Sequence, residues 1–320
     1  MARVTDPEVL IPAARDGNRR ALARLITLIE NGDGAGGEAL SRVFPSGGGA
    51  WTTGLTGAPG SGKSTLTDCL IGEAREGGAE IAVIAVDPSS PFSGGAVLGD
   101  RVRMQDHVDD AGVYIRSMAS RGHLGGISAA TPRVIALLDG IGFPEIFIET
   151  VGVGQAEVEI AGNADTTEVV INPGWGDSVQ AAKAGLLEIG DIFVVNKADR
   201  PGVNEAMRDL TQMLELGGQR GWSPPLVPTV ASQGDGVDEL WAAVQAHRRF
   251  LEGTDALRSV RSERLVAEME AALMDELRIQ VGATIPDSEW SQITGRVANR
   301  DIDPWSAAAQ ILRAIGVASE

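Results

Sequence analysis

The 320-residue chain has a single cysteine, Cys69, and no long hydrophobic run. One thiol cannot form an intrachain disulfide or a thiolate cluster, so Cys69 is expected to be structural and the compartment reducing. The longest aliphatic run, residues 81–86, is far shorter than the roughly 18 residues that indicate a membrane helix, and the N-terminus shows no signal-peptide pattern. We therefore expect a cytoplasmic protein that does not enter a membrane.

Positive charge is also scarce. The chain has 27 Lys and Arg against 44 Asp and Glu, a net charge of −17. Such a surface would repel a phosphate backbone, so no sequence-independent binding of nucleic acid is expected. Hydrophobic residues make up 43% of the chain, which is enough to bury a sizeable core.

From Trp51 onward, short apolar runs alternate with helical segments. This alternation predicts an α/β fold with a mostly parallel central sheet and helices on both faces. The predicted strands are residues 52–56, 81–86, 113–118, 146–150, 168–171, 192–196 and 226–230.

A phosphate-binding motif follows the first predicted strand and opens a helix, which is the context that makes it meaningful. Its glycines let backbone N–H groups point at phosphate oxygens, and the helix N-terminus adds partial positive charge. Lys63 is predicted to bridge the β- and γ-phosphates, and the Ser64 hydroxyl to ligate Mg²⁺. The candidate nucleotide-binding residues of this P-loop are Gly57, Pro59, Gly60, Ser61, Gly62, Lys63, Ser64 and Thr65.

A base-recognition motif, Asn196-Lys197-Ala198-Asp199, ends a later predicted strand. The Asp199 carboxylate can accept from N1–H and the exocyclic amine of guanine, whereas adenine presents a lone pair at N1. Such a site can discriminate by about 10⁴-fold. The Lys197 stem can cover the base plane, and Asn196 can tie the loop to the P-loop. The sequence therefore predicts binding of GTP and GDP.

Three carboxylates are candidates for the magnesium shell together with Ser64. Most GTPases end the strand facing the γ-phosphate in the motif Asp-x-x-Gly. Here Glu149 stands at the position of the aspartate and Gly152 at that of the glycine. The Gly152 N–H could bond the γ-phosphate. Asp87 follows the second predicted strand, and Asp100 lies between the second and third. Asp87 could instead end its strand, and Asp100 could be a helix N-cap.

Helical segments flank this domain. Ala21, Leu25 and Ile29 recur at helical spacing within residues 1–45, and a break at residues 44–49 indicates a linker. The P-loop GTPase domain is expected over residues 46–253, followed by a helical extension over residues 254–320. Two apolar stripes of that extension are predicted to pack on the main domain or on a second subunit: Val266, Met269, Leu273, Leu277 and Val281, then Trp305, Ala309, Leu312 and Ile315.

Taken with the P-loop and residues 196–199, four further segments resemble the MeaB-type GTPases: residues 86–92, 99–104, 116–126 and 149–155. Those proteins are chaperones of adenosylcobalamin-dependent acyl-CoA mutases such as methylmalonyl-CoA mutase. The resemblance covers roughly residues 10–315. It implies a homodimer held partly by the C-terminal helices, nucleotide-gated delivery or protection of cobalamin, and hydrolysis accelerated by the mutase.

The resemblance also assigns individual residues. Lys63, Asp87, Asp100 and Glu149 match the family's phosphate and magnesium residues. Asp177 and Lys183 match an additional switch segment that meets the mutase, although Lys183 could equally be an ordinary exposed helix lysine.

Arg121 and His123 look like switch or partner-contact residues by the same resemblance. For His123, capping or core packing is an equal alternative.

Two departures from known patterns matter. Trp175 stands where a small residue is expected in MeaB-type proteins, so the partner-facing surface is expected to differ. Val230 stands where GTPases usually carry serine, which leaves the Ala231 backbone N–H as a candidate contact to guanine O6.

The isolated chain is expected to hydrolyse GTP slowly. Val153 follows Gly152, where Ras-like switches place a water-orienting glutamine, and the nearest glutamine is Gln155. The resting site should therefore lack part of its catalytic machinery until a partner orders it.

Two alternatives belong to other functional classes. A nickel-delivery GTPase commonly carries clustered Cys or His ligands, but the chain has only Cys69 and the histidines His107, His123 and His247. A transport-linked P-loop kinase would use ATP, which residues 196–199 disfavour. A nucleotide-preference assay separates the kinase from the GTPase.

Overall fold

The computed structural model describes residues 5–87, 107, 109–119, 130–150, 160–174, 185, 187–216 and 221–317. The chain forms two compact units, Met1–Arg258 and Ser259–Glu320. Among the described residues, no helix is both long enough and apolar enough to cross a membrane.

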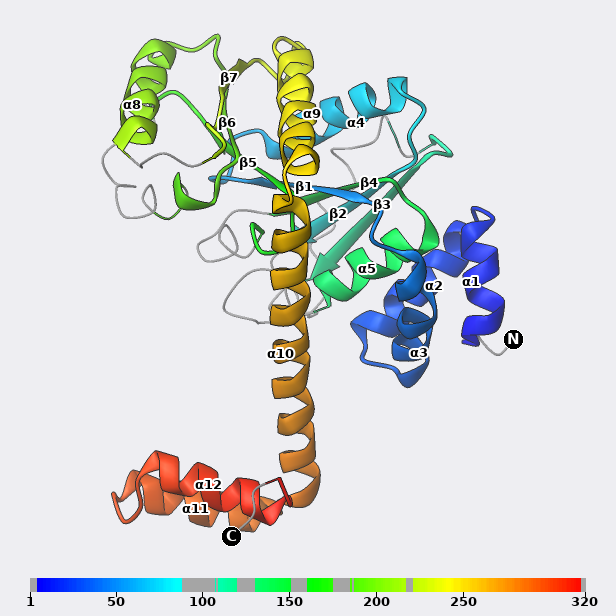
Figure 1. Ribbon diagram of the computed structural model, residues 1–320, viewed down its shortest axis with the longest axis vertical. Coiled ribbons are helices and arrows are strands. Elements are labelled where there is room, and N and C mark those ends of the chain that lie inside the picture. Colours follow the sequence, from blue (N-terminus) through cyan, green and yellow to red (C-terminus); the bar gives the residue numbers. More distant parts are fainter. Residues whose placement is uncertain are drawn as a thin grey trace. The chain divides into compact units, whose positions relative to one another are not determined.

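The first unit is built on a seven-stranded sheet whose neighbouring strands all run parallel (Figure 1). The strand order is β3-β2-β4-β1-β5-β6-β7, so β1 lies at the centre. This confirms the predicted α/β fold, and every predicted strand range overlaps an observed one. The strands are β1 (Trp51–Thr56), β2 (Ile81–Asp87), β3 (Val113–Ala119), β4 (Glu145–Thr150), β5 (Thr166–Ile171), β6 (Ile192–Asn196) and β7 (Leu226–Thr229).

Helices cover both faces of the sheet, as a parallel sheet requires. Alternate side chains of one strand enter different cores: Val83 packs with helices α4 (Lys63–Glu76) and α9 (Val237–Gly253), whereas Ile84 packs with α5 (Thr131–Ile141) and the N-terminal helices. A third cluster joins β5 and β6 to α8 (Val203–Leu216).

Three N-terminal helices pack on the β3-β2-β4 half of the sheet: α1 (Pro7–Arg15), α2 (Arg19–Glu30) and α3 (Gly34–Val43). The Asn18 side chain begins α2 by accepting from the backbone N–H groups of Arg20 and Ala21. From β3, Arg116 forms an ion pair with Glu30 of α2. The residues expected to form only a linker include a short 3₁₀ helix, Phe44–Ser46.

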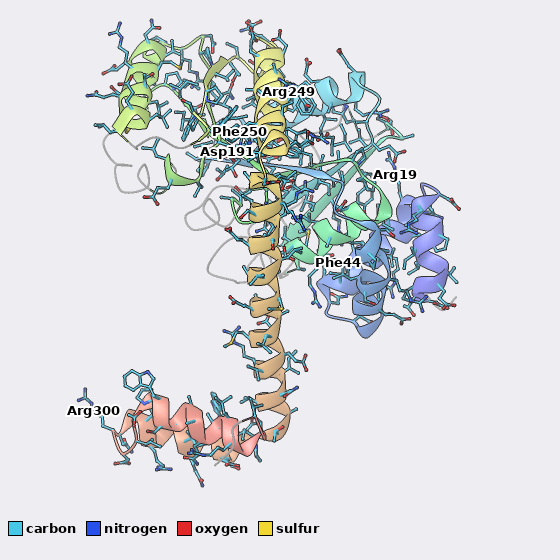
Figure 2. The ribbon with its side chains drawn as sticks, viewed as in Figure 1. Arg19, Phe44, Asp191, Arg249, Phe250 and Arg300 are labelled. Atoms are coloured by element: carbon cyan, nitrogen blue, oxygen red, sulfur yellow. The ribbon has the colours of Figure 1, made fainter. Side chains whose placement is uncertain are left out.

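A buried histidine fixes α9 on the amino ends of the strands. The His247 Nδ1 lies 3.0 Å from the Thr166 hydroxyl of β5, and its ring packs against Trp222 and Phe250. Figure 2 labels Phe250 and Asp191 on this side of the sheet. Burial lowers the pKa of His247 to about 4, so the imidazole is neutral and acts as a core residue.

The second unit is helical, with α10 (Ala256–Thr284) leading into α11 (Asp287–Ala298) and α12 (Pro304–Ala314). The first predicted stripe lies within α10, and the second lies within α12 except for Ile315, which follows the end of that helix. Several of their members are exposed, including Met269 at 62%, Leu273 at 57% and Trp305 at 81%.

Candidate functional site

The carboxyl ends of the central strands bring the predicted motifs to one edge of the sheet. β1 lies between β4 and β5, and β5 pairs with β6. The P-loop follows β1, Glu149 lies near the end of β4, and Asn196 ends β6. Ligands of open α/β sheets bind at this edge, where the strand order reverses.

Glycine is required at two P-loop positions by backbone conformation and by space. Gly57 has φ 135° and Gly62 has φ 99°, both in the region that favours glycine. A Cβ on Gly57 would lie 2.1 Å from the Val170 carbonyl of β5, and one on Gly62 would lie 2.2 Å from Asn196 Nδ2. The P-loop is therefore packed directly against the ends of β5 and β6.

Lys63 and Ser64 lie at the start of α4, as predicted, and both are buried. The Lys63 ammonium donates to the carbonyls of Gly57 at 2.5 Å and Ala58 at 3.1 Å. The Ser64 hydroxyl donates to Glu149 Oε1 at 2.5 Å, which brings together two of the four predicted metal ligands. Of the loop's other candidates, Ser61 is fully buried, whereas Pro59, Gly60 and Thr65 are exposed.

The Ser64 and Glu149 oxygens fit a hard divalent cation. Mg²⁺ prefers oxygen ligands and is commonly held by one or two carboxylates together with substrate phosphates. The Glu149 side chain is 2% exposed, so water does not compete freely for its oxygens. The Asp87 backbone ends β2, while its side chain and all of Asp100 lie outside the described part of the chain.

Asn196 connects the base-recognition loop to the P-loop. Its Nδ2 donates to the Ser61 carbonyl at 2.7 Å. Its Oδ1 accepts from the Lys197 N–H, the Ala231 N–H and the Thr229 hydroxyl. One buried amide therefore fixes the relative position of the P-loop, β6 and the loop after β7.

Lys197 and Asp199 follow on the same loop. Lys197 has φ 60°, a left-handed conformation that costs energy for a residue with a side chain, and its Nζ donates to the Gly60 carbonyl at 2.5 Å. Asp199 is exposed, so its carboxylate is accessible to a ligand.

The predicted guanine contact of Ala231 stays a prediction, since its N–H donates to Asn196 here. Sequence reasoning missed Thr229, the hydroxyl donor to Asn196 at the end of β7. The sequence signal that could have identified it is a threonine two residues before Ala231, within the last predicted strand. The switch candidates Gly152, Asp177 and Lys183, like Arg121 and His123, lie outside the described residues.

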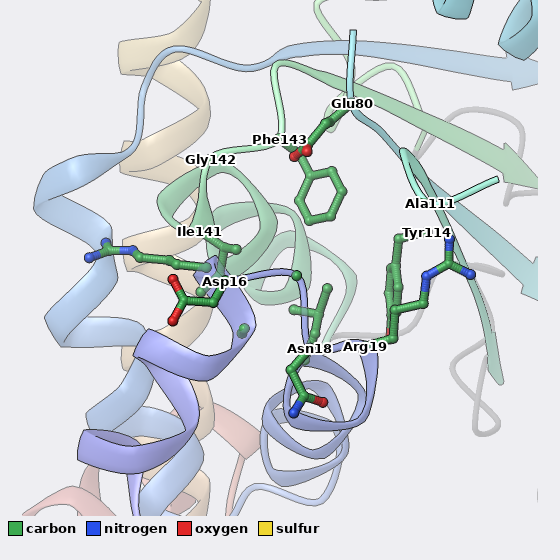
Figure 3. A pocket seen from close by; sticks show the side chains of 13 residues that line it. Asp16, Asn18, Arg19, Glu80, Ala111, Tyr114, Ile141, Gly142 and Phe143 are labelled. Carbon is green, nitrogen blue, oxygen red and sulfur yellow. The ribbon is translucent and has the colours of Figure 1, made fainter.

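A separate groove of about 360 Å³ lies at the amino ends of β3 and β4. Figure 3 shows Tyr114 and Phe143 in its wall, with Asn18 from the turn before α2 and Arg19 from the first position of α2. The groove contains none of the predicted site residues and lies at the opposite end of the strands from the P-loop.

Comparison with known proteins places these features in a family. The model of "Methylmalonyl Co-A mutase-associated GTPase MeaB" matches residues 22–285. A putative GTPase of Pyrococcus abyssi is 49% identical over 310 residues, 96% of each chain. The mitochondrial methylmalonic aciduria type A homolog of Mus musculus is 39% identical over 193 residues, 59% of this chain and 46% of that protein. A crystal structure of an LAO/AO transport system kinase matches the fold with a TM-score of 0.72 at 24% identity, covering 98% of each chain.

Proposed function

Because this chain belongs to the MeaB family of P-loop GTPases, we propose that it is a GTP-hydrolysing switch for an adenosylcobalamin-dependent acyl-CoA mutase. In this role it gates loading, protection or reactivation of the mutase's cobalamin cofactor. Methylmalonyl-CoA mutase is the proposed partner, since the family description and the mouse relative both name methylmalonyl or methylmalonic chemistry. A cytoplasmic location is part of the proposal.

The observation that best supports guanine binding is the double role of Asn196. Its amide bonds the Ser61 carbonyl of the P-loop and accepts the Lys197 N–H of the base-recognition loop. The phosphate and base sites are thereby held in one fixed arrangement. Asp199 lies exposed on the same loop, where its carboxylate can accept the two guanine donors.

The chain's own residues account for phosphate binding. The Lys63 ammonium is held by two P-loop carbonyls and can turn from them to the β- and γ-phosphates of a bound nucleotide. The N-terminus of α4 supplies further N–H groups and partial positive charge. The charge of the ammonium and the partial charge of the helix N-terminus both favour a polyphosphate over a neutral ligand.

Ser64 and Glu149 are the proposed magnesium residues, joined by Asp87 and Asp100. Bound Mg²⁺ would neutralise charge on the β- and γ-phosphates. To admit the ion, the Ser64 hydroxyl would turn from Glu149 and offer its lone pair to the metal. The backbone N–H of Gly152, three residues after Glu149, is proposed to bond the γ-phosphate and to be released on hydrolysis.

The proposal includes a homodimer formed partly by α10 to α12. The exposed Met269, Leu273 and Trp305 support it, because exposed apolar side chains of this size favour burial against another surface. Asp177 and Lys183 are proposed to complete the hydrolytic site when the mutase binds.

One experiment tests the proposed function. Single-turnover hydrolysis of GTP and of ATP is measured with and without methylmalonyl-CoA mutase loaded with adenosylcobalamin. The expected result is hydrolysis of GTP alone, with a low basal rate that rises when the mutase is added. A preference for ATP would reject the base-site assignment, and a fast basal rate unchanged by the mutase would reject the switch.

A further inference from the structure

The turn after β5, residues 172–174, lies between the P-loop and the chain that follows the base-recognition loop. On one side, the Asn172 Nδ2 donates to the Gly60 carbonyl at 3.4 Å. On the other side, a Cβ built on Gly202 would lie 3.9 Å from both the Gly174 nitrogen and the Pro173 Cβ. The turn therefore contacts the P-loop and lies near Gly202, three residues after Asp199.

The strand before this turn also contacts the P-loop. The Val170 carbonyl lies so close to Gly57 that a Cβ there would approach it to 2.1 Å. Gly57 and Gly60 are thus both contacted by the end of β5, through Val170 and Asn172. This part of the chain forms a wall of the P-loop.

Asn172 and Lys197 share one acceptor. The Lys197 Nζ donates to the same Gly60 carbonyl at 2.5 Å, so the amide and the ammonium lie side by side. The Asn172 Oδ1 is buried and makes no hydrogen bond within the described residues. An ammonium has three donors, and the Gly60 carbonyl accepts one of them. Asn172 acts on Lys197 through the Gly60 carbonyl that both side chains bind.

We propose that Asn172 is a positioning residue for guanine-nucleotide binding. It holds the Gly60 carbonyl toward Lys197 and orients the Lys197 side chain, whose stem covers the base. This inference rests on the proposed function, which makes the P-loop and residues 196–199 a guanine-nucleotide site.

The expected consequence concerns affinity more than the chemical step. Asn172 contacts the P-loop at Gly60 and acts on the base through Lys197, and both contacts serve GDP and GTP alike. Loss of the amide should therefore weaken both nucleotides by a similar factor. Since one net hydrogen bond changes affinity by up to about tenfold and this one is long, a loss of about three- to tenfold is expected.

The test uses the full chain and two variants. Asn172→Ala removes the side-chain amide, and Asn172→Leu removes its polar atoms while keeping a side chain of similar size. Asn204→Ala, on the exposed surface of α8, is the matched control. Dissociation constants for fluorescent GDP and for a non-hydrolysable GTP analogue are measured for each protein, with thermal unfolding without nucleotide as the check on folding.

We expect both Asn172 variants to lose about three- to tenfold in affinity for both nucleotides, with kcat within about threefold of wild type and unfolding unchanged. The control should match wild type. If the Asn172 variants bind within about twofold of wild type, the inference is overturned while the proposed function stands. If the wild type binds no guanine nucleotide, both are overturned.

A second readout isolates Lys197. The lysines of this chain are Lys63, Lys183 and Lys197, so amine acylation followed by mass spectrometry reports on each separately. Lys197 should be acylated faster in Asn172→Ala than in wild type, whereas Lys63 should be unchanged. Equal Lys197 rates in the two proteins would overturn the claim that Asn172 orients this side chain.

Discussion

The Lys63 ammonium donates to the Gly57 carbonyl at 2.5 Å, so the proposed phosphate-binding lysine also bonds the backbone of its own P-loop. A second bond to Ala58 at 3.1 Å holds the same ammonium. Lys63 therefore has a structural contact in addition to its proposed catalytic one, and its substitution tests both.

Lys63→Ala should abolish GTP hydrolysis and lower the free energy of unfolding by only about 1–2 kcal/mol, since two hydrogen bonds of modest net strength are lost. Circular dichroism and single-turnover hydrolysis measure the two effects. Arg208→Ala, exposed on α8, is the control and should change neither. Loss of the helical signal together with activity would show that Lys63 is needed mainly for folding.

Asp199→Asn should move the nucleotide preference from guanine toward xanthine. An amide can donate to the O2 oxygen of xanthine, whereas the native carboxylate accepts from the guanine amine. Competition binding with GDP, XDP and ADP measures the change. Asp209→Asn, exposed on α8, makes the same chemical substitution away from the loop and should leave the preference unchanged. Retained guanine preference in Asp199→Asn would mean that another group reads the base.

The sheet was predictable because short strand-like segments, most of them rich in apolar residues, alternate with helical segments along the chain. All six residues of β1 and of β4 are buried, as expected for a parallel sheet covered on both faces. The amphipathic pattern of α2 predicted a helix. It could not show that α1 to α3 pack on β3, because an apolar stripe does not identify the surface that covers it.

The site was predictable where residue type and spacing define the chemistry, as in the P-loop and at Asn196. It was less so where a common residue acquires a role from its neighbours. Asn172 and Thr229 follow or end strands, where such residues usually belong to turns. Their hydrogen bonds depend on the order β1-β5-β6-β7, which spacing along the chain does not reveal.

Lys183→Ala should reduce the stimulation of GTP hydrolysis by the mutase. Charge supplied by a partner-ordered group accelerates hydrolysis by about 10³ to 10⁵ in other GTPases, so most of the stimulated rate should be lost. Lys183→Arg retains the charge and should keep a larger share of the stimulation. The ratio of stimulated to basal single-turnover rates is measured for each protein. A fully stimulated Lys183→Ala would direct attention to Arg121, to Arg103 in the segment 99–104 that resembles the MeaB-type GTPases, or to a residue of the mutase.

Glu168 is an acid buried in the centre of the sheet. It lies in β5 opposite Leu55 of β1 and Ile192 of β6, it is 0% exposed, and neither carboxyl oxygen has a hydrogen-bond partner within the described residues. Burial raises its pKa from 4.5 to about 8, because the charged form loses its hydration. The folded protein therefore carries a proton on Glu168 at neutral pH.

This proton makes stability depend on pH in a defined direction. Between pH 4.5 and about 8 the folded state binds a proton that the unfolded state has released, so the free energy of unfolding should fall as pH rises. The contribution of one group is about 1.4 kcal/mol per pH unit at most, and it levels off above the folded pKa. Glu168→Gln cannot ionise and should lose this decline.

Urea unfolding of wild type and Glu168→Gln at pH 5.5, 7 and 8.5 measures the effect. The variant should gain stability relative to wild type as pH rises, with the largest difference at pH 8.5. The pKa of Glu145 is also raised, to about 7, but Glu145 is present in both proteins and its contribution cancels in the comparison. Glu80→Gln, at an exposed position, is the control and should track wild type. A difference between wild type and Glu168→Gln that is the same at all three pH values would mean that Glu168 does not carry the proton.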